Sequence, residues 1–230
     1  MLNFDINVYW VVNIGPIEIW ITDTLLVTVG IMLLLITLAI IVRVKLRNFT
    51  EVPTGFQNFI EFAVEAFDKF VCENAGPKLS WVGGWFFSVF AFLLVSNMSG
   101  IISFVRPPTA DWAMTMALAT ISIVMMQCVG LWYRGWDYIK GFMKPFFIFL
   151  PINIMGEMSR PISLSFRLFG NVLGGMIVVS LVYALAPMVL ALFLPVILHA
   201  YFDIISGLLQ AFVFTILSLT YLGLAANSTD

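Results

Sequence analysis

A single arginine stands in the middle of a long apolar stretch in the last third of the chain. Residues 159–176 read SRPISLSFRLFGNVLGGM, with Arg167 between Phe166 and Leu168. An arginine at membrane depth costs roughly 3 kcal/mol on insertion scales and about 10 kcal/mol or more in simulations. Its guanidinium stays charged in proteins, because its pKa is above about 12. These residues therefore indicate a permanent positive charge that is held inside a membrane for a function.

Polar residues at helical spacing accompany this charge. Positions i, i+4 and i+7 share a helical face, which places Asn171 and Gly174 on the side of Arg167. An antiparallel partner helix would bring Gln210 near Arg167. The last apolar segment carries its own polar stripe, with His199 one turn before it: Asp203, Ser206, Gly207, Gln210. Two interpretations remain open, a charge exposed to a partner helix between polar access routes, or an arginine that pairs with Asp203 or Glu157 inside the bundle.

The sequence predicts no metal site and no cofactor. His199 and Asp203 have the i, i+4 spacing of a metal-binding pair, but there is no third ligand and no HExxH motif. The two cysteines, Cys72 and Cys128, form no CxxC motif. Asp203 is the only aspartate in the last two apolar segments, so neither a paired-aspartate nor a Ser–His arrangement supports an intramembrane enzyme.

The composition predicts an all-α integral membrane protein. Of 230 residues, 61% are hydrophobic and 10% are charged, and the mean hydropathy is +1.03. Ordinary soluble domains carry about 25% charged residues. A net charge of −2 is too small to indicate a nucleic-acid partner. The N-terminus has no basic region and Asp5 precedes the first apolar run, so we expect no cleaved signal peptide.

Hydropathy predicts five membrane-inserted helices and one interfacial helix in a single membrane domain, residues 1–230. Residues 1–22 are expected to form an amphipathic lead on the outer face, and the first three spans are 24–42, 81–105 and 113–133. Basic residues follow the first and third spans and mark these ends as cytoplasmic: Arg43, Lys45, Arg47, Arg134, Lys140, Lys144. The N-terminus is therefore expected outside and the C-terminus in the cytoplasm.

Residues 53–76 have a different pattern. Phenylalanines recur at helical spacing while acidic residues fall elsewhere around the helix, with Pro53–Thr54 as its start and Gly76–Pro77 as its stop. This pattern favours an amphipathic helix lying in the cytoplasmic interface. The alternative is a helix packed on a soluble partner.

The last two apolar segments, residues 146–186 and 188–225, are about twice as long as a membrane span requires. Each forms either two short passes or one long, strongly tilted helix. The candidate turns lack polar loop residues: Pro151, Pro161, Gly174, Gly175, Pro195, Gly207. We therefore predict two long tilted helices that form a hairpin joined around Pro187. No internal repeat is visible, which weakens an inverted-repeat transporter interpretation.

The stretch SRPISLSFRLFGNVLGG, together with the later LLQAFVFTILSLTYLGLA, resembles subunit a of the bacterial F-type rotary ATP synthases. The similarity extends to the basic loops, the PTAD link and the order of spans, and so covers nearly the whole chain. The resemblance implies a non-catalytic stator subunit in the bacterial plasma membrane. Its implied partners are the c-ring of c subunits, the peripheral-stalk b subunits and lipid, with no nucleic acid, and the translocated ion is H⁺ or Na⁺.

The resemblance also implies roles for individual residues. The matching arginine, Arg167, faces a c-ring whose subunits each carry one ion-binding carboxylate, and two aqueous half-channels lead to opposite membrane faces. The long hairpin would then face this ring. Asn171 and Gln210 match the polar partners of the arginine. Three residues fall where the outer half-channel would be lined: Asn97, Asp111, Thr115. His199 and Ser206 are further candidates for half-channel lining.

Two positions depart from a well-known bacterial pattern of this family. That pattern has a glutamate nine residues after the arginine and a histidine seven before the glutamine, where this chain has Met176 and Asp203. Asp203 is therefore our candidate for ion relay along the outer access route, with sodium still open as the coupling ion. A stand-alone secondary transporter, with Arg167 binding an anionic substrate, is the competing class.

Overall fold

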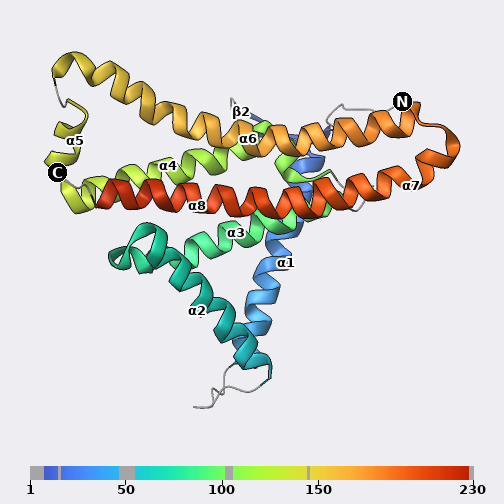
Figure 1. The fold of residues 1–230 in the computed structure, drawn as a ribbon, viewed down its shortest axis with the longest axis horizontal. Helices are drawn as coiled ribbons and strands as arrows, with labels where there is room; N and C mark the ends of the chain where they lie inside the picture. Colours follow the sequence, from blue (N-terminus) through green and yellow to red (C-terminus); the bar gives the residue numbers. More distant parts are fainter. Residues whose placement is uncertain (1–7, 15–16, 47–54, 102–105, 144–145, 228–230) are drawn as a thin grey trace. The chain divides into compact units, whose positions relative to one another are not determined.

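The structure is a computed structural model that describes residues 8–14, 17–46, 55–101, 106–143 and 146–227 (Figure 1). In this part of the chain, five helical stretches are long and apolar enough to cross a membrane. They are Asp23–Lys45, Pro77–Ile101, Trp112–Arg134, Phe147–Leu185 and Phe193–Ala226. The prediction of an all-α integral membrane protein with five membrane-inserted helices is confirmed.

The N-terminal lead is a β-hairpin, which the sequence analysis did not anticipate. Strand β1 (Val8–Ile14) pairs antiparallel with β2 (Ile17–Thr22), with Val12 opposite Ile19. β-Branched and aromatic residues, which suit a pleated strand, dominate both strands. Asp5 lies outside the described residues, and the position of this lead on the outer membrane face remains a prediction.

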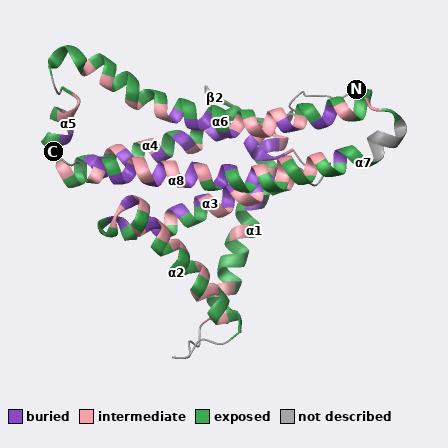
Figure 2. Ribbon diagram, in the orientation of Figure 1, coloured by how far each residue is buried: buried purple, intermediate pink, exposed green. Residues whose placement is uncertain are grey.

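Helix α1 (Asp23–Lys45) is apolar on all sides and largely exposed in the isolated chain (Figure 2), as expected of a helix that faces lipid. Its basic last turn holds Arg43 and Lys45, whereas Arg47 lies outside the described residues.

Helix α2 (Phe56–Ala75) is the amphipathic helix expected from the sequence. Its predicted start, Pro53–Thr54, lies outside the described residues, but its stop is confirmed. Gly76 has a φ of 93°, which glycine adopts at low cost, and its N–H donates to the Cys72 carbonyl at 3.0 Å. Phe59 and Phe62 are exposed, while Val71 and Ala75 are buried. Its placement in a membrane interface remains a prediction.

The second and third spans keep their predicted centres with small changes at the ends. Helix α3 (Gly83–Met98) is preceded by the 3₁₀ segment η1 (Pro77–Val82) and followed by η2 (Ser99–Ile101). After η3 (Pro108–Ala110), helix α4 (Trp112–Arg134) leads into the short helix α5 (Trp136–Gly141). Residues 102–105 and Lys144 lie outside the described residues.

The last two segments form two long helical stretches, as predicted. After η4 (Phe147–Phe149), helix α6 (Leu150–Leu185) continues through Pro161 for 36 residues. Helix α7 (Met188–His199) continues through the π-helical segment η5 (Ala200–Ser206) into α8 (Gly207–Ala226) without leaving helical backbone angles. Proline is tolerated in membrane helices because neighbouring groups satisfy the freed backbone. The two stretches reverse direction at Pro187 (Figure 1), and their tilt remains a prediction.

The chain forms two compact units. The first, which we name the site unit, comprises Met1–Ala39, Ala91–Thr115 and Arg167–Ala211. The second, the core unit, comprises Ile40–Phe90, Met116–Phe166 and Phe212–Asp230. The core unit holds a hydrophobic cluster from α2, η1, α3, α4, α5 and α8, including Val71, Leu79, Phe86, Met126 and Leu219. All nine predicted site residues belong to the site unit.

Candidate functional site

Arg167 lies on α6 with its side chain exposed, and no hydrogen bond or ion pair to another described residue neutralises it. Its two candidate acidic partners bind elsewhere. The Asp203 carboxylate contacts His199, and the Glu157 carboxylate contacts Arg160. The interpretation that Arg167 pairs with Asp203 or Glu157 inside the bundle therefore has no support in the described residues.

Asn171 and Ser206 join α6 to η5 one turn from this arginine. The Asn171 Nδ2 donates to Ser206 Oγ at 2.7 Å, and Ser206 Oγ lies 3.0 Å from Asn171 Oδ1. In the same antiparallel register Gly175 lies against Phe202, since a Cβ at Gly175 would be 2.9 Å from the Phe202 ring. The close approach thus depends on Gly175, whereas a Cβ on Gly174, which shares the face of Arg167, would meet nothing within 4 Å.

One further turn of this register brings Gln210 to the level of Arg167. The residue follows Ser206 by four positions, as Arg167 precedes Asn171 by four. Gln210 is only 7% exposed. The antiparallel arrangement expected from the sequence is therefore present, although among the described residues no hydrogen bond joins Gln210 to Arg167.

His199 and Asp203 form a hydrogen-bonded pair at the start of the π-helical segment. His199 Nδ1 lies 2.7 Å from Asp203 Oδ2, and the two side chains are 25% and 17% exposed. The Tyr183 ring on α6 lies beside the imidazole, with ring centroids 6.5 Å apart. Single π-helical turns are frequent at functional sites. The pair joins an imidazole to a carboxylate, two groups that exchange protons in many sites.

Asn97 binds protein groups through both atoms of its amide. It is 3% exposed, its Nδ2 donates to the Gly207 carbonyl at 2.9 Å, and its Oδ1 accepts from Thr109 Oγ1 at 2.8 Å. Buried amides need such partners. Asn97 therefore ties α3, η3 and the start of α8 together, a role that the sequence did not reveal.

Asp111 and Thr115 both shape the first turn of α4. Asp111 Oδ1 accepts from the Ala113 N–H at 2.9 Å, an N-cap, and its Oδ2 accepts from Thr24 Oγ1 at 3.1 Å. Thr115 is fully buried and donates to the Trp112 carbonyl at 3.0 Å. Asp111 thus anchors the start of α4 to α1.

Sequence reasoning missed three contributors to this site, namely Thr24, Thr109 and Gly100. The two threonines stand at the borders of apolar runs, where a hydroxyl is a weak signal of a hydrogen bond. Gly100 lies next to the carboxylate of Asp203, a contact between distant parts of the chain that no local pattern indicates. Among the described residues, no three histidine, cysteine or acidic side chains gather as metal ligands would.

Comparison with known proteins gives consistent matches along the chain. The family described as ATP synthase A chain matches residues 25–223. The ATP synthase subunit a of Geobacter sulfurreducens is 36% identical over 198 residues, which are 83% of this chain and 82% of the relative. The subunit a of Solidesulfovibrio magneticus is 37% identical, covering 82% and 79%. ATP synthase subunit a 2 of a Bradyrhizobium species is 34% identical, covering 94% and 93%.

Proposed function

This chain belongs to the ATP synthase A chain family, and from the geometry of its site we propose that Arg167 is the fixed charge that couples ion flow to rotation of a c-ring. Members of the family are multi-pass membrane subunits of ATP synthase, with a stator role in ion-coupled ATP synthesis. The subunit itself is non-catalytic and works together with the c-ring and the peripheral-stalk b subunits.

The observation that carries the proposal is the exposed, unneutralised guanidinium of Arg167. A cation lowers the pKa of a nearby carboxylate and so favours its ionised form. Arg167 therefore promotes ion release from each c-subunit carboxylate that passes it, and it repels cations that would leak directly between the half-channels. An arginine with a permanent internal partner would do neither. Asn171 and Gln210 flank the charge and orient the helix pair that presents it.

The outer half-channel leads to this charge through the site unit. Asp203 with His199 relays the ion, and Ser206 continues the polar route towards Asn171. Asn97, Asp111 and Thr115 support this route by anchoring the ends of α3, α4 and α8. Because the relay is a carboxylate–imidazole pair and not a cage of oxygen ligands, the proton suits it better than sodium.

The membrane arrangement completes the proposal. The N-terminal hairpin lies outside, the C-terminus lies in the cytoplasm, and α2 lies in the cytoplasmic interface of the bacterial plasma membrane. The long hairpin of α6 with α7–α8 is tilted against the c-ring. The basic residues that end α1 and α4 support this orientation.

The decisive experiment replaces Arg167 with alanine in the assembled synthase. We expect ATP-driven ion pumping into vesicles to be lost, while the complex still assembles and hydrolyses ATP. The matched control is Arg43→Ala, which removes an exposed arginine at the end of α1 and should retain pumping. Full coupled pumping by the Arg167→Ala complex would contradict the proposal. Substrate flux through the purified chain alone would instead support a secondary transporter.

A further inference from the structure

The carboxylate of Asp203 lies against a glycine. Gly100 belongs to η2, at the end of α3, within the site unit. A Cβ atom at Gly100 would lie 3.0 Å from Asp203 Oδ1, 3.2 Å from Cγ and 3.5 Å from Oδ2. The first two distances are shorter than ordinary van der Waals contacts. Any side chain at position 100 would therefore push directly on the carboxylate.

Backbone conformation does not explain why a glycine stands here. Among the described glycines, only Gly55, Gly76 and Gly135 have the positive φ that disfavours other residues. Gly100 does not have a positive φ, so the relevant feature is its lack of a side chain. The close approach of another group does require a glycine at this position, and that group is the Asp203 carboxylate.

On its other side the carboxylate is held by His199, at 2.7 Å between Nδ1 and Oδ2. Hydrogen bonds weaken steeply as they lengthen or bend. A shift of a few tenths of an ångström that relieves a new contact at position 100 would change this bond. The geometry of the His199–Asp203 bond therefore depends on the absence of a side chain at Gly100.

The π-helical segment is closely packed at two points, which opposes its moving aside to relieve such a contact. At Gly207, its end is bonded to Asn97, and a Cβ there would lie 2.8 Å from the Asn97 Cβ. On α6, Gly175 packs directly on Phe202, the residue before Asp203. Because both neighbours are packed this tightly, we expect the adjustment to occur in the Asp203 side chain.

We propose that Gly100 is a positioning residue for Asp203: its lack of a side chain admits the carboxylate in the orientation bonded to His199. This inference rests on the proposed relay role of Asp203. Among the described residues, His199 from α7 and Gly100 of η2 lie against the carboxylate, and α6 presents Tyr183 beside His199. Proton exchange along the outer route thus depends on a residue that has no functional group of its own.

The test is Gly100→Ala in the complete synthase, with ATP-driven pumping followed in vesicles over a range of external pH. We expect a several-fold loss of pumping rate and a displaced pH profile, because the relay geometry has changed. Gly30→Ala is the matched control, since a Cβ at this helical glycine of the same unit would meet nothing within 4 Å. A Gly100→Ala complex with wild-type rate, or with a slower rate but an unchanged pH profile, would overturn the inference.

A double-mutant cycle separates positioning from general damage. In a His199→Ala background the bond is already lost, so Gly100→Ala should add little further loss. If Gly100→Ala impairs assembly, then Asp203→Ala should restore assembly to the double variant, because the contact at position 100 is gone. A double variant that assembles no better would show that the clash lies elsewhere and would overturn the inference.

The single variant Asp203→Ala distinguishes this inference from the proposed function. Wild-type pumping by Asp203→Ala would show that Asp203 is not an ion relay. Loss of pumping in Asp203→Ala, together with a normal Gly100→Ala complex, would leave the relay role intact and reject only the positioning role of Gly100.

Discussion

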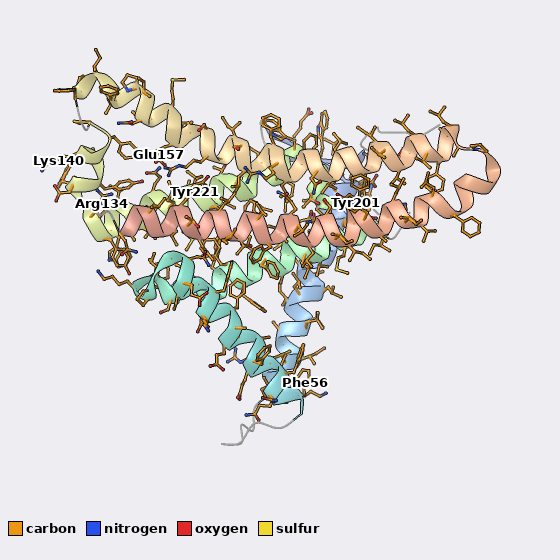
Figure 3. The ribbon with its side chains drawn as sticks, in the orientation of Figure 1. Phe56, Arg134, Lys140, Glu157, Tyr201 and Tyr221 are labelled. Atoms are coloured by element: carbon orange, nitrogen blue, oxygen red, sulfur yellow. The ribbon has the colours of Figure 1, made fainter. Side chains whose placement is uncertain are left out.

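Two arginines of α6, seven residues apart, have opposite surroundings. In the core unit, Arg160 Nη1 lies 2.8 Å from Glu157 Oε1, and its guanidinium lies over the Tyr221 ring at 4.8 Å. Figure 3 labels Glu157 on α6 and Tyr221 on α8. Both residues contact Arg160. In the site unit, Arg167 is exposed and has no ion-pair partner among the described residues.

The comparison shows that apolar surroundings alone do not define the role of a membrane arginine. Arg160 is neutralised within its own chain, and its neighbours continue the network. Gln127 Nε2 lies 3.5 Å from Glu157, and the Tyr138 hydroxyl donates to Gln127 Oε1 at 2.7 Å. Burial raises the pKa of Tyr138, as does the nearby Glu157 carboxylate, so this hydroxyl remains a donor at neutral pH. Arg160 therefore serves the fold, whereas Arg167 remains available to a charge from outside the chain.

The largest effect is expected when Arg167 is replaced by lysine, which keeps the positive charge but not the planar guanidinium. Arg167→Lys should lower ATP-driven pumping by about tenfold or more, because a compact ammonium lacks the planar, delocalised guanidinium and shifts its pKa readily. The thermal stability of the solubilised complex should stay unchanged, because Arg167 has no partner to lose among the residues that the structure describes. Pumping and thermal denaturation of one preparation measure both. Lower stability with intact pumping would show that Arg167 serves the fold and not ion transport, which would contradict its contrast with Arg160.

A loss of stability is expected when the compensated arginine is removed. Arg160→Leu leaves Glu157 without its counter-charge, which costs about 3–5 kcal/mol for a fully buried pair. The two side chains are 30% and 19% exposed, so we expect about 1–2 kcal/mol. Thermal denaturation of the solubilised complex measures the loss. The double variant Arg160→Leu/Glu157→Leu should recover much of it, and a double variant less stable than the single one would contradict the pairing.

Tyr221, the aromatic partner of Arg160, should contribute less to the stability of the protein than Glu157, its acidic partner. Tyr221→Leu removes the cation–π contact and should lower stability by about 1 kcal/mol. Tyr221→Phe keeps the ring face and should stay close to wild type in the same denaturation assay. Equal losses in the two variants would show that the hydroxyl, not the ring, provides the stabilisation.

The smallest effect is expected at the polar contact near Arg167. Ser206→Ala removes both hydrogen bonds with Asn171, which is half-buried and gains water partners instead. We expect a loss of about 0.5–1 kcal/mol and a modest decrease in pumping. A loss of pumping as complete as in Arg167→Ala would show that Ser206 is indispensable to the ion route and not only one of several polar groups along it.

The sequence determined the parts of this protein that local patterns encode. Span lengths follow from apolar runs, the end of α2 follows from Gly76, and the unusual character of Arg167 follows from its surroundings in the chain. The N-terminal hairpin was locally encoded as well, by β-branched and aromatic residues, but the apolar composition of the chain concealed that signal. A helical period or a turn residue acts over a few positions, so these features required no knowledge of packing.

Only the tertiary structure decided which polar groups meet. Asn97 binds Gly207 across 110 positions, and Thr24 binds Asp111 across 87. The spacing of His199 and Asp203 resembled a metal pair, whereas the structure shows a hydrogen-bonded pair beside Gly100. Such contacts depend on the register in which helices pack and on the π-helical turn of η5. Residue spacing along one helix does not encode either, so the neutralisation of Arg160 and the availability of Arg167 emerged only from the folded chain.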